Sequence, residues 1–189
     1  MGLEGAKPVG AREGRSGLMP SEQSTGDWFA VRVRSNFERA TAQSLDCRGI
    51  KCFLPLYKAR RQWSDRIKEV DLPLFTGYVF CHLDEPRFLP ILETPGVVQV
   101  VGTGARPVPV EAHEMAALWR IAGSGQEAMP WPYLTVGQRL RIRTGALKDV
   151  EGILANADGR VRVVVNIELL QRSVAVSVER LDLEPVWPH

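Results

Sequence analysis

Hydrophobic and polar positions divide the chain into two blocks with different periodicity. Between residues 27 and 122, strand-like runs alternate with stretches whose apolar residues recur every three or four positions, as in helices. From 135 to 187 the helical spacing disappears and only short strand-like runs remain. The pattern therefore predicts an α+β unit at 27–122 and an all-β unit at 135–187, joined by a linker at 123–134.

The first unit is predicted to follow the order β-α-β-β-β-α-β-α. Ser35 or Asn36 is expected to cap the first helix, which would bury one face. The residues expected on that face are Phe37, Ala40, Thr41, Ser44 and Leu45. Expected strands cover 28–34, 51–57, 67–72, 74–83 and 97–101, and two later helices cover 86–92 and 111–122. Together they predict a sandwich of helices on an antiparallel sheet, with Tyr78 to Cys81 in a central strand.

The second unit is predicted to be a small β-barrel. Short strands are expected at 138–143, 150–155, 161–167, 173–178 and 181–183. Asp158-Gly159 is a hairpin turn signal between two of them. Gly and Ser at the start of the linker favour flexibility, and Pro130 and Pro132 stiffen its second part.

Composition narrows the class of protein. Residues 1–26 are rich in Gly, Ser, Pro and charge and are predicted to form a disordered tail. The net charge of +2 provides no global attraction to nucleic acid, so any such binding needs a local basic patch. The chain has neither a secretory signal nor an apolar run of about 20 residues, so no membrane association is expected. With three cysteines in no framework spacing, a cytoplasmic monomer is predicted.

Two stretches resemble a known family when they are taken together. Trp28 to Val31, Phe53-Leu54-Pro55-Leu56, the block PLFTGYVF at 73–80 and Thr94 to Val97 resemble the NGN domain of NusG proteins and of their specialised RfaH-like paralogs. The run 136–142, followed by a loop between Gly145 and Gly152, resembles a KOW motif, which implies an SH3-like barrel. Its glycines are expected to permit positive φ and close backbone approach.

The resemblance implies that the first domain binds RNA polymerase. The matching residues are Phe75, Tyr78, Phe53, Pro55 and Leu56. They are expected to line an apolar hollow, open just after Pro73, that receives the clamp helices of the largest polymerase subunit. Ordinary core packing is the alternative for these residues.

A nucleic-acid contact is also implied by the resemblance. RfaH-like proteins touch non-template DNA near positions that match Arg34 and Arg39. Trp63, beside Arg60 and Arg61 on a predicted hairpin tip, has the chemistry to stack a base between phosphate-binding cations. The alternative is a solvated charged surface and a tryptophan that covers the hairpin.

In the second domain, Leu147, Leu169 and Leu170 are the candidate docking residues. The resemblance implies ribosomal protein S10 or the termination factor Rho as partner. The β-branched runs at 161–165 and 174–178 predict a stable barrel that does not refold into helices, as the corresponding segment of RfaH does.

No residue pattern indicates catalysis, a cofactor or a metal. Cys81 and His82 are neighbours on a predicted strand and so point to opposite faces. Cys47 and Cys52 are spaced more widely than ordinary zinc ligands. We therefore expect a non-enzymatic transcription elongation factor that modulates pausing, termination or antitermination. The alternative is a ribosome-associated or RNA-binding KOW protein.

Overall fold

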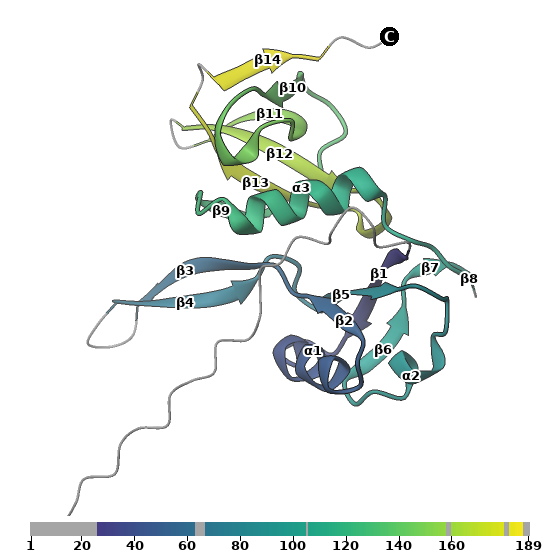
Figure 1. Cartoon of the computed structure of the whole chain (residues 1–189). Coiled ribbons are helices and arrows are strands. Elements are labelled where there is room, and N and C mark those ends of the chain that lie inside the picture. The colour runs from purple at the N-terminus through teal and green to yellow at the C-terminus, as the bar shows by residue number, and fades with distance from the viewer. Residues whose placement is uncertain (1–25, 63–66, 105, 158–159, 180–181, 187–189) are drawn as a thin grey trace, which may run out of the picture.

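The computed structural model describes residues 26–62, 67–104, 106–157, 160–179 and 182–186. Its elements lie in layers: helices α1 and α2, an N-terminal sheet, helix α3 and a C-terminal sheet (Figure 1). Within the described ranges, no helix is long and apolar enough to cross a membrane. The predicted tail, apart from Gly26, and the Asp158-Gly159 turn lie outside the described residues.

The N-terminal unit is the predicted α+β arrangement. Its elements are β1 (Asp27–Val33), α1 (Glu38–Cys47), β2 (Lys51–Phe53), β3 (Leu56–Gln62), β4 (Ile67–Pro73), β5 (Tyr78–Leu83), α2 (Leu89–Leu92), β6 (Val97–Val100), β7 (Gly102–Thr103), β8 (Arg106–Pro107) and α3 (Ala112–Gly123). Four strands form an antiparallel sheet in the order β2-β5-β1-β6, which confirms that β5 is an interior strand.

The two faces of this sheet bury alternate residues because successive side chains of a strand point to opposite sides. Val31 of β1 and Val79 of β5 pack in a core cluster with Leu45 of α1 and Ile91 of α2. Their neighbours on the opposite face, among them Phe80, belong to a second cluster that includes α3. The sheet is therefore covered by helices on both faces.

The expected strand 51–57 is divided at Leu54 and Pro55. β2 ends at Phe53, and β3 begins at Leu56 and pairs only with β4 in a separate two-stranded ribbon. Proline has no N–H to continue a ladder. Instead, the Pro55 carbonyl accepts a hydrogen bond from the Leu74 N–H at 2.9 Å. This contact ties the base of the ribbon to the block after Pro73.

Helix α1 begins later than its capping signal predicts. Phe37 occupies the N-cap without a side-chain hydrogen bond, and Asn36 has a left-handed φ of 67°. Ala40 is exposed, contrary to the prediction, and Phe37 is 50% exposed, so its expected place on the buried face is also wrong. Glu38 is buried in its stead, and its carboxylate accepts a 2.8 Å hydrogen bond from the Gly77 N–H.

The C-terminal unit contains the five predicted strands and one more. They are β9 (Ala128–Trp131), β10 (Arg139–Ile142), β11 (Glu151–Ala157), β12 (Arg160–Ile167), β13 (Arg172–Ser177) and β14 (Leu183–Pro185), with short 3-10 turns η1 (Gly145–Leu147) and η2 (Glu168–Leu170). The order is β14-β10-β11-β12-β13-β9, with all neighbours antiparallel. β9 lies in the expected linker, so that segment is partly built into the C-terminal sheet.

Two glycines of the KOW-like loop have the predicted roles. Gly145 has a φ of 75°, in the left-handed region that favours glycine. Gly152 lies so close to β12 that an added Cβ would stand 2.4 Å from the Val164 carbonyl oxygen. Close pairing of β11 with β12 therefore depends on the missing side chain.

Candidate partner-binding face and the seam that covers it

An aromatic cluster fills the space between the N-terminal sheet and α3. Trp119 of α3 stacks on Phe53 of β2, with ring centres 3.8 Å apart and planes 18° apart. Trp28 meets Trp119 edge-on at 5.7 Å, and Phe75 meets Phe80 edge-on at 5.6 Å. Such pairs stabilise a core beyond the burial of their area.

The expected open hollow after Pro73 is closed in this structure. Phe75 is 1% exposed and Phe53 is 4% exposed, and Pro55 is also buried. Trp119 lies over the Phe53 ring. The Phe53 ring is therefore not free to contact a helix pair from another protein, and the buried Phe75 ring is not free either. In this arrangement Phe53 and Phe75 are core residues, which is the alternative interpretation that the sequence left open.

Leu56 and Tyr78, the other two residues of the expected face, are half-buried. The guanidinium of Arg172, from β13, lies over the Tyr78 ring at 5.4 Å from its centre. Leu56 lines a hollow of about 360 Å³ together with Tyr57 and Leu74 on one side and Ala128 of β9 on the other. Both residues therefore lie where the two units meet, which we call the seam.

Polar contacts between α3 and the C-terminal sheet hold the seam together. The Glu114 carboxylate accepts a hydrogen bond from the Glu168 N–H of η2 at 2.9 Å. Arg120 donates to the Lys148 carbonyl and lies 4.0 Å from the Asp149 carboxylate. Burial raises the pKa of Glu114, and the hydrogen bond from Glu168 partly offsets this rise. Figure 1 shows α3 between the N-terminal and C-terminal sheets. Its Trp119 packs toward the N-terminal sheet, and its Glu114 and Arg120 contact the C-terminal unit.

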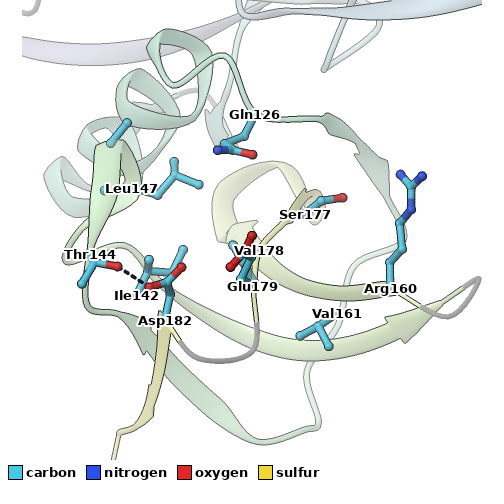
Figure 2. Close-up of a pocket in the computed structure, with 12 residues that line it drawn as sticks. Gln126, Ile142, Thr144, Leu147, Arg160, Val161, Ser177, Val178, Glu179 and Asp182 are labelled. Atoms are coloured by element: carbon cyan, nitrogen blue, oxygen red, sulfur yellow. Dashed lines mark hydrogen bonds between the residues drawn. The ribbon is translucent and has the colours of Figure 1, made fainter.

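The candidate docking leucines of the C-terminal unit lie in the same buried region. Leu147 is 4% exposed in η1, which packs against α3, and Leu170 is 8% exposed. Leu169 is half-buried against the same core cluster. Leu147 also lines a hollow of about 440 Å³, where Figure 2 shows it with Ile142 and Gln126, which line the same hollow. The leucines therefore form no exposed patch here.

The candidate nucleic-acid residues are only partly gathered. Arg34 is exposed after β1, and Arg39 is exposed on α1 and donates to the Asp71 carbonyl of β4 at 2.9 Å. Arg60 and Arg61 lie on β3, opposite Glu69 and Lys68, but their side chains are outside the described part. Trp63 is also outside the described residues. Arg39 therefore braces the ribbon against α1.

Three residues that form the seam were not predicted from the sequence. They are Glu114, Trp119 and Arg172. A signal existed for α3, whose residues 112–122 place apolar side chains around most of the helix rather than along one stripe. Such a pattern is typical of a helix buried on more than one side. Nothing comparable in the sequence distinguishes Arg172 from the other exposed arginines.

Cys81 and His82 point to opposite faces of β5, as predicted. Cys81 packs in the cluster beneath α1, with its sulfur 3.6 Å from that of Cys52. His82 instead lies against Trp28, with ring centres 5.2 Å apart. The two side chains therefore cannot act on one substrate.

Comparisons with known proteins place the chain in a family. Residues 26–119 match the family model described as transcription termination factor nusG. The transcription termination/antitermination protein NusG of Lactococcus lactis is 24% identical over 173 residues, covering 84% of this chain and 92% of the relative. That of Thermus thermophilus is 27% identical over 164 residues, covering 75% and 89%.

A solved structure has the same fold. The structure titled "Domain interaction in Thermotoga maritima NusG" aligns with a TM-score of 0.55 and 23% identity, covering 86% of this chain and 98% of that one. The family-model match is supported by the NusG relatives and by the shared fold. The chain therefore belongs to the NusG family of transcription termination and antitermination factors.

Proposed function

We propose that this chain binds RNA polymerase through the half-buried apolar residues at the seam and modulates transcript elongation from there. Leu56, Tyr57 and Tyr78 form this surface, which we call the polymerase face. Phe53 and Phe75 support it from beneath as core residues. A tyrosine and a leucine beside a hollow of mixed apolar and polar lining are suited to receive a helix pair.

The observation that carries the proposal is that this face is covered by the chain's own C-terminal sheet. Arg172 lies over Tyr78, and β9 forms the far wall of the hollow beside Leu56. The covering contacts include polar and charge-assisted ones that water can replace once the units separate. Polymerase binding therefore requires the C-terminal sheet to move away.

The same movement uncovers a second surface. We assign the C-terminal sheet as a KOW barrel whose Leu147, Leu169 and Leu170 meet a further protein once α3 no longer covers them. By family resemblance that partner is ribosomal protein S10 or Rho. Each unit masks the partner site of the other, so both sites become available together. A tethered second domain then acts at raised effective concentration near the polymerase.

Nucleic-acid contact is a subsidiary part of the proposal. Arg34 and Arg39 are exposed on one side of the N-terminal unit, and Arg60 and Arg61 follow on the ribbon. The hydrogen bond from Arg39 to Asp71 keeps the ribbon near α1 and thus near Arg34. Displaced single-stranded DNA beside the polymerase would meet several cations, which makes this part of the binding salt-dependent.

The test is direct binding of the purified full-length chain to core bacterial RNA polymerase. Tyr78→Asp and Leu56→Asp place a charge on the polymerase face and are expected to weaken binding at least tenfold. Val136→Asp is the matched control, because Val136 is 84% exposed and is not among the residues that line the hollow beside Leu56. Unfolding curves and far-UV spectra must show that each variant keeps its fold.

Three results would contradict the proposal. The first is equal binding by all four proteins. The second is loss of binding by the control alone. The third is co-sedimentation with ribosomes, insensitive to Tyr78→Asp and without polymerase binding, which would support the ribosome-associated alternative.

A further inference from the structure

The Glu114 side chain, in the first turn of α3, lies in the contact between α3 and the C-terminal unit, and it is only 3% exposed. One carboxylate oxygen accepts the Glu168 N–H at 2.9 Å, across 54 positions of sequence. The other oxygen, Oε2, is buried and has no hydrogen-bond partner among the described residues. A buried carboxylate with a single hydrogen bond is costly in its ionised form.

Among the described residues, no cation forms an ion pair with Glu114. On α3, His113 favours the ionised carboxylate while Glu111 opposes it, and Glu168 on η2 also opposes it. Arg120 is engaged by the Lys148 carbonyl and by Asp149. The cleft of about 730 Å³ that Glu114 helps to line also holds Tyr133, Arg139, Asp149 and Glu151. Glu151 is occupied by Arg141 at 2.6 Å.

We propose that Glu114 takes up one proton from water when the C-terminal sheet docks on α3, so that acid favours the docked form and alkali favours release. The docked carboxyl is then neutral: its carbonyl oxygen keeps the hydrogen bond from Glu168, and the proton resides on Oε2. When the C-terminal sheet leaves α3, the Glu114 carboxyl is exposed to water and gives up its proton to the solvent. Docking binds at most one proton, and this uptake is largest at pH values between the pKa of the released carboxyl and the higher pKa of the docked one.

The sign follows from proton linkage. Burial, first among the causes, raises the pKa of Glu114 above the ordinary glutamate value of 4.5. The docked form therefore binds the proton more tightly than the released form. Its added stability is complete below pH 4.5 and is lost as the pH rises through the higher pKa of the docked state.

The experiment follows docking in the isolated full-length chain between about pH 4.5 and pH 8. The radius of gyration from small-angle X-ray scattering reports separation of the units, and the Glu168 amide resonance reports the contact itself. Wild type is compared with Glu114→Gln, which holds a neutral side chain at every pH, and with Glu111→Gln, which removes an exposed carboxylate three positions earlier on the same helix.

The wild type should expand, and the Glu168 resonance should move toward its released position, as the pH rises. Glu114→Gln should stay docked throughout, while Glu111→Gln should keep the transition. A wild type with constant size and constant Glu168 resonance overturns the proposal, and so does an equal transition in Glu114→Gln. The proposal rests on the docked arrangement and not on polymerase binding, so this experiment can fail while the proposed function stands, or the reverse.

Discussion

The guanidinium carbon of Arg172 lies 5.4 Å from the centre of the Tyr78 ring, and this pair joins the four-stranded N-terminal sheet to the six-stranded C-terminal sheet. Tyr78 belongs to β5 of the N-terminal sheet, whereas Arg172 opens β13 of the C-terminal sheet. A contact that links the two units and covers a residue of the proposed polymerase face would connect domain docking with partner binding. Such coupling requires that a partner bind one arrangement better than the other.

Replacing Arg172 by alanine should loosen the seam. Removing an exposed cation from an aromatic face costs about 0.5–1 kcal/mol, a two- to fivefold shift toward the released form. Nuclear spin relaxation would detect it as more independent tumbling of the two units. Arg143→Ala is the control, since Arg143 is an exposed arginine next to β10. Identical tumbling of both variants would contradict a role for the pair.

Phe75→Ala should destabilise the fold rather than selectively remove a binding contact. Phe75 is 1% exposed and packs on Phe80, so truncation should lower the free energy of unfolding by about 3–5 kcal/mol. Phe75→Leu keeps most of the volume and should cost less. Urea denaturation measures both. A stability loss below about 1 kcal/mol for the alanine variant would mean that Phe75 is not core.

Glu38 should stabilise the packing of α1 against Gly77, the residue just before β5. Its buried carboxylate accepts the Gly77 N–H at 2.8 Å, and a hydrogen bond to a charged group contributes about 1.5–3 kcal/mol. Glu38→Ala should lose that amount in chemical denaturation. Glu38→Gln retains an acceptor oxygen and should lose less. Equal losses for the two variants would show that the hydrogen bond is not the cause.

Gly152→Ala should damage the C-terminal sheet. The new Cβ would stand 2.4 Å from the Val164 carbonyl oxygen, and relieving such overpacking costs about 1–3 kcal/mol. Gly123→Ala is the matched control: it ends α3, has no heavy atom within 4 Å of the added Cβ, and should be neutral or slightly stabilising. Thermal unfolding distinguishes them, and a neutral Gly152→Ala would contradict the close approach.

Local patterns predicted most of the fold because strand alternation and helical spacing act within a few residues. The α+β character of the N-terminal unit, the three helices and the interior position of β5 follow from such patterns. The division of strand 51–57 and the β7–β8 pair were not predicted, and the roles of Gly145 and Gly152 were expected from the KOW resemblance. The exposure of Phe37 and the burial of Glu38 could not be predicted, because they depend on an acceptor for the Gly77 N–H, 39 positions away.

The candidate site was harder to predict, because burial at the seam depends on how the two units pack. Family resemblance singled out Tyr78 and Leu56, which do lie at the seam, but it could not tell that Phe75 is core or that Leu147 rests against α3. β9 was missed because its short sequence contains Pro130 and is followed by Pro132, which is typical of a linker. Its pairing partner, β13, lies more than 40 positions later in the chain.

The most direct test of the central claim is the affinity of full-length Arg172→Glu for core RNA polymerase, compared with wild type and Arg143→Glu. The charge reversal removes the cover from Tyr78 but leaves the polymerase face itself intact. We predict that Arg172→Glu binds at least threefold more tightly than wild type and that Arg143→Glu matches wild type. Unchanged or weaker binding by folded Arg172→Glu would contradict the claim that the C-terminal sheet masks the polymerase-binding face.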